Sequence, residues 1–218
     1  MPLNNFDLIV FDMDGTLIDS MGCLEDWIYR AIKDDCPPSL TPSAVSAAFG
    51  PTERKIIESF VPAGRAAACL EAYYALYEAE HGRVVVYPGI DELLRQIRQR
   101  GVPMALCTGK SRRATEISLA RLGWKDHFKF IVAGDDMARF KPDPDGLDQI
   151  LARGEFERSR SIFVGDTVAD IAAAANAGML SGHALWSRPG ALPAGAPKPA
   201  YEFPTPQRLL SLLIPGRG

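Results

Sequence analysis

Short apolar runs separated by longer amphipathic stretches occur along most of the chain. Three of these runs lead directly into a polar residue. They cover residues 7–11, 101–107 and 161–165, which are followed by Asp12, Thr108 and Asp166. An apolar run of this length, without polar alternation, is typical of a strand buried on both faces. Two weaker runs at residues 128–133 and 180–186 resemble them. The pattern therefore predicts a buried sheet with strands at these five places.

The stretches between the predicted strands carry a helical repeat. One has Ile90, Leu93, Leu94 and Ile97 before Gly101, and another has Val168, Ile171, Ala172 and Ala175 before Gly178. This spacing indicates helices with one buried face, and a glycine commonly follows the last helical residue. Strands that alternate with helices predict a parallel sheet covered by helices on both sides. The predicted fold class is α/β, with a three-layer, Rossmann-like parallel-sheet core.

Residues 20–87 interrupt this alternation, because they contain helical patterns but no convincing central strand. One apolar face consists of Leu24, Ile28 and Ile32, and another consists of Leu70, Tyr73, Tyr74 and Tyr77. We predict an all-helical cap domain over residues 20–87, inserted into a core formed by residues 1–19 and 88–218. The tyrosines are interpreted as the core of this insertion, with a role in lining a substrate pocket as the alternative.

Composition narrows the class of protein. A chain of 218 residues is long enough for a core domain with a smaller inserted one. Its net charge of −3 disfavours nucleic acid and anionic membranes as partners. No apolar run approaches the roughly 18 residues of a membrane span, and Met1 to Asn5 lack a signal-type pattern, so a cytoplasmic location is expected. The scattered cysteines are interpreted as reduced thiols. A monomer and a homodimer both remain open.

The first candidate for chemistry is the segment Asp12-Met13-Asp14-Gly15-Thr16, which leaves the first predicted strand. Two carboxylates two residues apart can approach one ligand where the loop turns sharply, and Gly15 permits such a turn. A solvated loop or a helix cap is the alternative interpretation of this short motif. The residues at the other strand ends therefore decide its meaning.

Three further segments supply groups suited to a phosphate and a metal ion. Thr108 and Gly109 offer a hydroxyl and a backbone N–H just before a predicted helix, a favourable position for a phosphate oxygen. Lys141 is a cation in a loop with two prolines, and Asp166 and Asp170 add carboxylates. Hard oxygen ligands with a phosphate completing the shell suit Mg²⁺. We expect these strand ends to converge on one phosphate site.

This ordered set resembles the haloacid dehalogenase-like superfamily, in its phosphoglycolate phosphatase and β-phosphoglucomutase-like branch with a helical cap after the first motif. The set is D-x-D-G-T, a threonine before a helix, Lys-Pro, and G-D-x-x-x-D, and the likeness covers essentially the whole chain. One position departs from the pattern, because Gly109 stands where many relatives carry asparagine. The resemblance implies a phosphoric monoester hydrolase that acts on a small phosphorylated metabolite.

The resemblance also implies a role for each matching residue. Asp12 would attack phosphorus to form an aspartyl-phosphate, while Asp14 would protonate the leaving alcohol and then activate water. Thr108, Gly109 and Lys141 would bind the phosphate. Mg²⁺ would be held by Asp12, the backbone carbonyl of Asp14 and Asp166, with Asp170 orienting the ligands.

Asp14 separates the branches of this superfamily, because its dehalogenases and phosphonate-cleaving members do not keep the second aspartate. A phosphosugar mutase of the β-phosphoglucomutase type retains all four motifs and is the first alternative. A non-catalytic binding or regulatory protein on the same fold is the second. Within the cap, Arg54 and Lys55 are predicted to pair with a carboxylate or second phosphate of the substrate. We therefore expect a phosphoglycolate-type or sugar-phosphate-type substrate.

Overall fold

A six-stranded, entirely parallel sheet forms the centre of the computed structural model, which describes residues 6–187, 190 and 192–213. Its strand order is β5-β4-β1-β6-β7-β8. The strands are β1 (Leu8–Phe11), β4 (Met104–Cys107), β5 (Phe130–Val132), β6 (Ser161–Gly165), β7 (Leu180–Ala184) and β8 (Tyr201–Phe203). The chain proceeds from β1 outward to β5 and then returns to β6 on the other side of β1. Such a reversal opens a ligand crevice at the carboxyl end of β1.

Helices cover both faces of the sheet, which confirms the predicted three-layer class. Alternate residues of β1 enter two different cores, with Ile9 and Phe11 in one and Leu8 and Val10 in the other. The first core is covered by α5 (Ile90–Gln99), α6 (Arg112–Arg121) and α9 (Pro206–Ser211). The second is covered by α7 (Asp145–Gly154) and α8 (Val168–Asn176). Both faces of β1 are therefore buried, as its continuous apolar run predicts.

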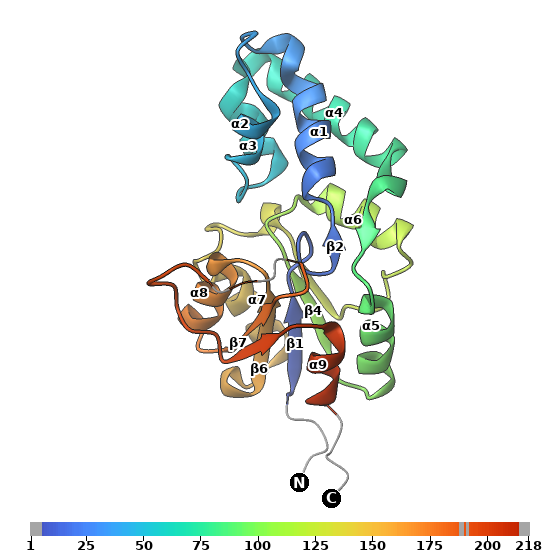
Figure 1. Cartoon of the computed structure of the whole chain (residues 1–218), viewed down its shortest axis with the longest axis vertical. Coiled ribbons are helices and arrows are strands. Elements are labelled where there is room, and N and C mark those ends of the chain that lie inside the picture. The colour runs from blue at the N-terminus through green and yellow to red at the C-terminus, as the bar shows by residue number, and fades with distance from the viewer. Residues whose placement is uncertain (1–5, 188–189, 191, 214–218) are drawn as a thin grey trace, which may run out of the picture.

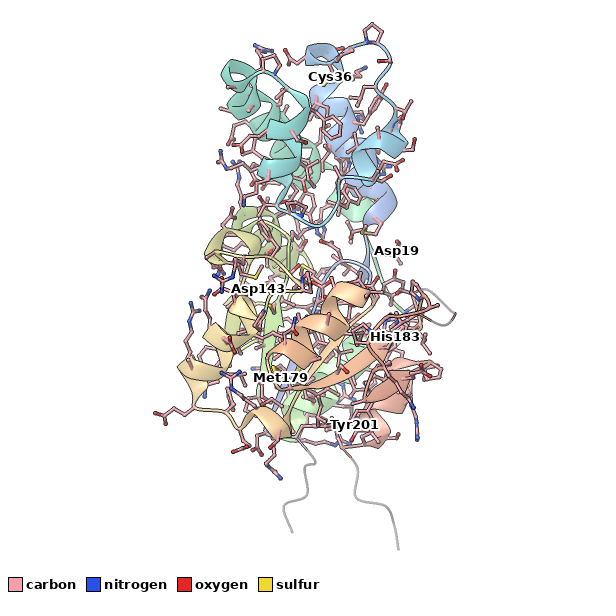
Figure 2. All side chains as sticks on the ribbon, turned by 90° about the vertical axis from the view of Figure 1, so that its left-hand side faces the viewer. Asp19, Cys36, Asp143, Met179, His183 and Tyr201 are labelled. Carbon is pink, nitrogen blue, oxygen red and sulfur yellow. The ribbon has the colours of Figure 1, made fainter. Side chains whose placement is uncertain are left out.

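The inserted segment forms a separate helical body at one end of the molecule (Figure 1). Its helices are α1 (Met21–Ile32), α2 (Pro42–Ser46), α3 (Glu53–Phe60) and α4 (Ala63–Ala79), with short 3-10 turns η1 (Lys33–Asp35) and η2 (His81–Arg83). The antiparallel pair β2 (Ile18–Asp19) and β3 (Val85–Val86) carries the chain into and out of it. In Figure 2, Asp19 marks this junction and Cys36 lies near the outer end of the insertion.

The tyrosine stripe of α4 lies in the core, as interpreted from the sequence. Tyr73 and Tyr77 are fully buried and Tyr74 is nearly so. Trp27 of α1 meets Tyr77 edge to face, with ring centroids 5.1 Å apart. These aromatic contacts join the two longest helices of the insertion. They hold the insertion together and leave the cavity wall to other residues.

Three short strands of the structure were not predicted, and the predictions for the membrane and the cysteines can be compared with it. The edge strand β8 and the short pair β2–β3 were not predicted, because runs of two or three residues carry no periodic signal. Met1 to Asn5 lie outside the described residues. Within the described part of the chain, no helix is long and apolar enough to cross a membrane. The four cysteines are free thiols, with Cys69 and Cys107 buried.

Candidate active site

The carboxyl ends of three neighbouring strands bring the predicted residues together. Asp12 follows β1, Thr108 follows β4 and Asp166 follows β6. Because β4, β1 and β6 are parallel neighbours, their carboxyl ends meet at one edge of the sheet. This edge faces the insertion, and the loop of Lys141, marked by Asp143 in Figure 2, lies on the same side. The structure thus brings these residues to one edge of the sheet, and their use as a phosphate site stays a prediction.

The turn after Asp12 depends on glycine. The carbonyl of Met13 accepts the backbone N–H groups of Thr16, Leu17 and Ile18, which folds the loop tightly. Gly15 has φ +83°, and a Cβ there would lie 2.6 Å from a carboxylate oxygen of Asp166. A side chain at this position would be both strained and in collision. Gly15 therefore permits the turn and leaves space for Asp166.

Asp12, Asp166 and Asp170 form a buried carboxylate cluster. One oxygen from each lies within 4.8 Å of the others. Lys141 Nζ lies 3.0 Å from Asp12 Oδ1 and 2.6 Å from Asp170 Oδ1. The Thr16 hydroxyl donates to Asp166 Oδ1 at 3.1 Å. Three carboxylates around one ammonium group leave an excess of negative charge in a buried place, which a divalent cation with oxygen preference would balance. The donor set therefore fits a metal site.

The neighbouring charges in this cluster shift the pKa values of Asp12 and Lys141. Burial disfavours the charged carboxylate and raises the pKa of Asp12 to about 7; Lys141 opposes this rise, whereas Asp170, Asp166 and Asp14 add to it. Burial lowers the pKa of Lys141, but Asp12 and Asp170 outweigh it and raise the pKa above its ordinary value. Lys141 is therefore charged. A cation among the carboxylates would favour the ionised form of Asp12 that a nucleophile needs.

Asp170 serves the helix and the site together. Its Oδ2 accepts the backbone N–H of Thr167 at 2.9 Å, and the Thr167 hydroxyl accepts the Asp170 N–H at 3.2 Å, which makes a capping box at the start of α8. Its other oxygen faces Lys141. The helix cap thus fixes the direction of the carboxylate.

Asp14 lies against Lys110, a pairing that the sequence did not indicate. Lys110 Nζ lies 3.0 Å and 2.9 Å from the two oxygens of Asp14, and the Ser20 hydroxyl donates to the same carboxylate. The Lys110 side chain is fully buried. Burial lowers the pKa of Lys110, but Asp14, Tyr77 and Glu53 outweigh it, so the pKa lies above its ordinary value. A charged lysine therefore orients Asp14.

Glu53 links the insertion to this pair, a contact that was not predicted, because the pocket role in this segment was assigned to the neighbouring Arg54 and Lys55. It is the first residue of α3 and is buried. Its carboxylate accepts the backbone N–H of Ser111 at 2.8 Å and the Tyr73 hydroxyl at 3.1 Å, and lies 4.0 Å from Lys110 Nζ. The insertion thus contacts the sheet body beside Asp14.

Gly109 lets the two bodies approach closely. A Cβ at Gly109 would lie 2.7 Å from the backbone carbonyl oxygen of Gly50, in the loop before α3. A backbone atom cannot easily yield, so a larger residue would push the insertion away. The close approach of Gly50 gives a physical reason for glycine at position 109, where the sequence departs from the motif, which often has asparagine there. Thr108 lies beside it, buried, and its hydroxyl accepts the Lys110 N–H at 3.3 Å.

A cavity of about 570 Å³ lies between the insertion and the strand ends. Its wall on the sheet body includes Asp12, Asp14, Thr108, Gly109, Lys110 and Lys141. The insertion adds an opposing wall that includes Met21, Leu24, Glu25, Ile28, Phe49 and Glu53. If the phosphate group of a substrate lies at Asp12, the remainder of the substrate would therefore face the insertion.

Arg54 and Lys55 lie away from this cavity. Arg54 is exposed, and its guanidinium lies 3.8 Å from Glu58. Lys55 Nζ lies 4.4 Å from the centre of the Phe140 ring. The structure does not bring these two residues to the other site residues, and their role in specificity stays a prediction.

Comparison with known proteins identifies the family. The family model described as haloacid dehalogenase-like hydrolase matches residues 9–183, and the chain belongs to this family. Phosphoglycolate phosphatase of Pseudomonas putida is 32% identical over 181 residues, which cover 79% of this chain and 66% of that protein. The chain thus spans about two thirds of that relative's length. Pyrophosphatase PpaX of Anoxybacillus flavithermus is 26% identical over 210 residues, covering 96% and 97% of the two chains.

Solved structures share the fold. CbbY from Rhodobacter sphaeroides in complex with phosphate has a TM-score of 0.79 at 22% identity and covers 95% of this chain and 99% of its own. A haloacid dehalogenase-like family protein of Streptococcus pneumoniae has a TM-score of 0.73 at 22% identity, covering 95% and 98%. The family and its phosphatase relatives confirm the predicted enzyme class, a phosphoric monoester hydrolase of the capped, phosphoglycolate phosphatase-like type.

Proposed function

We propose that this chain is a magnesium-dependent phosphatase that hydrolyses a small phosphomonoester through an aspartyl-phosphate on Asp12. The observation that carries the proposal is the position of Lys141 between Asp12 and Asp170, with Asp166 beside them and Asp14 on the same cavity. Phosphoryl transfer asks a protein mainly for positioning and for compensation of negative charge. The sheet edge supplies both.

In the first half of the proposed reaction, an oxygen of Asp12 forms a bond to phosphorus as the bond from phosphorus to the leaving oxygen breaks. Asp14 gives its proton to that oxygen, and the alcohol leaves. Lys141, Thr108 and the backbone of Gly109 bind the phosphoryl oxygens. Lys110 and Ser20 hold the Asp14 carboxylate in place for both proton transfers.

In the second half, Asp14 removes a proton from a water molecule that attacks phosphorus. The bond between phosphorus and Asp12 breaks, which releases inorganic phosphate and restores the free carboxylate. Mg²⁺, held by Asp12, the backbone carbonyl of Asp14 and Asp166, with Asp170 orienting them, would offset the charge of the phosphate. The carboxylate cluster supports this assignment, because its excess negative charge would otherwise repel an anionic substrate.

The proposed division of labour follows the chain. Residues 1–19 and 88–218 form the catalytic core, and residues 20–87 form the cap that selects the substrate. The cavity between them supports this division, since its catalytic wall and its opposing wall come from different parts of the sequence. A phosphoglycolate-type ester fits the name of the phosphoglycolate phosphatase relative, and a sugar-phosphate-type ester is the second substrate type that we propose. Cap selection by Arg54 and Lys55 remains part of the proposal, although neither side chain lines the cavity.

Replacement of the nucleophile tests the function directly. Wild type and Asp12→Asn would be assayed with p-nitrophenyl phosphate and a panel of phosphomonoesters, with Mg²⁺ and with a chelator. We expect Asp12→Asn to lose activity by roughly 10³-fold or more and to form no acid-stable, hydroxylamine-sensitive phosphoprotein. Asp14→Asn is the matched control, since it should slow turnover but leave the nucleophile in place.

Near wild-type turnover in Asp12→Asn would overturn the covalent mechanism. Turnover that persists without metal would remove Mg²⁺ from it. A phosphosugar mutase would instead convert one sugar phosphate into an isomer without releasing phosphate, so the assay measures inorganic phosphate and sugar phosphate together.

A further inference from the structure

The part of the cavity opposite Asp12 has a distinctive chemistry. Its wall on the insertion is largely apolar, from Met21, Leu24, Ile28, Phe49 and Ile56. The charged side chains that the described part of the insertion contributes to this wall are Glu25 and Glu53. Neither lysine nor arginine from that part of the chain lines it. The surface that meets the leaving group is therefore apolar and acidic.

Glu25 stands out because its carboxylate is not used by the protein. It lies half-buried on α1, on the same helical face as Met21 and Ile28. Among the described residues it has no hydrogen bond or ion pair. Other acidic residues of the insertion are engaged by arginines: Asp26 by Arg83, Asp35 by Arg65, and Glu58 by Arg54. A carboxylate that faces an apolar cavity without a partner is suited to bind a cation from the substrate.

The charges around this end of the cavity also favour a cationic group on the substrate. Lys110 is the cation nearest to Glu53, but at 4.0 Å, whereas it lies 2.9 Å from Asp14. Asp14 and Glu53 thus share one ammonium group, and Glu25 adds a further carboxylate to the lining of the same cavity. A leaving group with a carboxylate would add a fourth negative charge to this cavity.

We infer that the cavity selects a phosphomonoester whose leaving alcohol carries an ammonium group on a short apolar chain, and that Glu25 and Glu53 contribute to this selection. The inference rests on the proposed phosphatase function. The ammonium group would pair with Glu25, and the chain would contact Met21, Leu24 and Ile28. Of the substrate types considered above, the acidic phosphoglycolate type is disfavoured by this wall.

Three esters of nearly equal length provide the test, because they differ mainly in the charge of the leaving group. They are 2-aminoethyl phosphate, 2-hydroxyethyl phosphate and 2-phosphoglycolate. We expect kcat/KM to fall in this order, with about tenfold or more between the first and the last. Competitive inhibition of p-nitrophenyl phosphate hydrolysis should follow the same order.

Glu25→Gln should reduce the ratio of kcat/KM for 2-aminoethyl phosphate over 2-phosphoglycolate by about tenfold. This change preserves size and breaks no contact of the described structure, so the fold should be unaffected. The matched control is Glu71→Gln on α4, whose carboxylate pairs with Arg113 on the surface and does not line the cavity; its ratio should equal that of wild type.

An equal or higher kcat/KM for 2-phosphoglycolate would overturn the inference, as would a ratio that Glu25→Gln leaves unchanged. Failure of the proposed function looks different. In that case p-nitrophenyl phosphate would not be hydrolysed above the level of Asp12→Asn. If the aryl ester is hydrolysed but the order of the three esters is reversed, the phosphatase stands and the assigned specificity falls.

Discussion

At the residue scale, the absence of a side chain at Gly109 determines how closely the insertion approaches the sheet body. The carbonyl of Gly50 occupies the place where its Cβ would stand, and the same loop leads into Glu53. Glu53 then reaches the N–H of Ser111 and the neighbourhood of Lys110. A residue that contributes no side chain therefore determines whether the insertion can contact the groups that orient Asp14.

Gly109→Ala should reduce kcat/KM by about tenfold while changing the free energy of unfolding little. The added methyl group would displace the Gly50 loop and with it Glu53, and a displacement of about 1 Å in a catalytic site can cost more than this. Steady-state kinetics with p-nitrophenyl phosphate measure the effect. Gly64→Ala is the control, since a Cβ there meets nothing within 4 Å. Equal activity of the two variants would contradict the role given to close approach.

At the scale of elements, the exit of the insertion is fastened to the sheet body through α6. Ser118 of α6 shares its hydroxyl between Tyr77 and His81, at 2.5 Å from the Tyr77 hydroxyl and 2.9 Å from His81 Nε2. Tyr77 belongs to α4 and His81 to η2. Two successive elements of the insertion thus contact one side chain of the core. These contacts fix the orientation of the insertion relative to the strand ends.

His81 should make stability depend on pH. Burial lowers the pKa of His81, and Lys110 and Arg121 lower it further, while Asp14 opposes them. Because the folded pKa lies below that of the unfolded chain, about 6.5, the unfolded state binds the proton more readily. The contribution of His81 is therefore present above pH 6.5 and is lost as the pH falls below that value.

Urea unfolding of wild type and His81→Gln at pH 8 and pH 5.5 tests this dependence. The wild type should lose more stability between the two pH values than the variant, since glutamine does not titrate. The comparison at pH 8, where the imidazole is neutral in both states, serves as the internal control. Parallel losses in the two proteins would show that His81 does not contribute.

At the scale of the whole molecule, the buried carboxylates of the sheet edge oppose folding, because Lys141 alone does not balance their negative charge. Asp12, Asp166 and Asp170 come from two strand ends and a helix, so they meet only in the folded chain. A metal ion that binds them binds the native state and stabilises it by mass action.

Mg²⁺ at one hundred times its dissociation constant should stabilise the protein by about 2.7 kcal/mol. For a chain of this size that corresponds to a rise in Tm of roughly 5–10 °C. Thermal unfolding with and without Mg²⁺ measures the shift. Asp166→Asn should abolish most of it, whereas Asp148→Asn, whose carboxylate pairs with Arg158 on the surface, should keep it. The same shift in both variants would place the ion elsewhere.

The sequence by itself determined the fold class and the centre of the site. Continuous apolar runs predicted buried parallel strands, and parallel strands necessarily end at one edge, so Asp12, Thr108 and Asp166 had to meet. Lys141 and Asp170 followed from the order of the motifs. These relations depend on local patterns and on the geometry common to all parallel sheets.

The tertiary structure alone decided how the insertion meets that edge. Four features depend on how the insertion packs against the sheet body. They are the pairing of Lys110 with Asp14, the contacts of Glu53, the position of Glu25 on the cavity wall and the exposure of Arg54. No periodic pattern encodes such contacts, because they join residues far apart in the chain and depend on single backbone approaches such as Gly50 to Gly109. The residues proposed for the reaction therefore follow from the strand ends, whereas the residues proposed for substrate choice depend on the packing of the insertion.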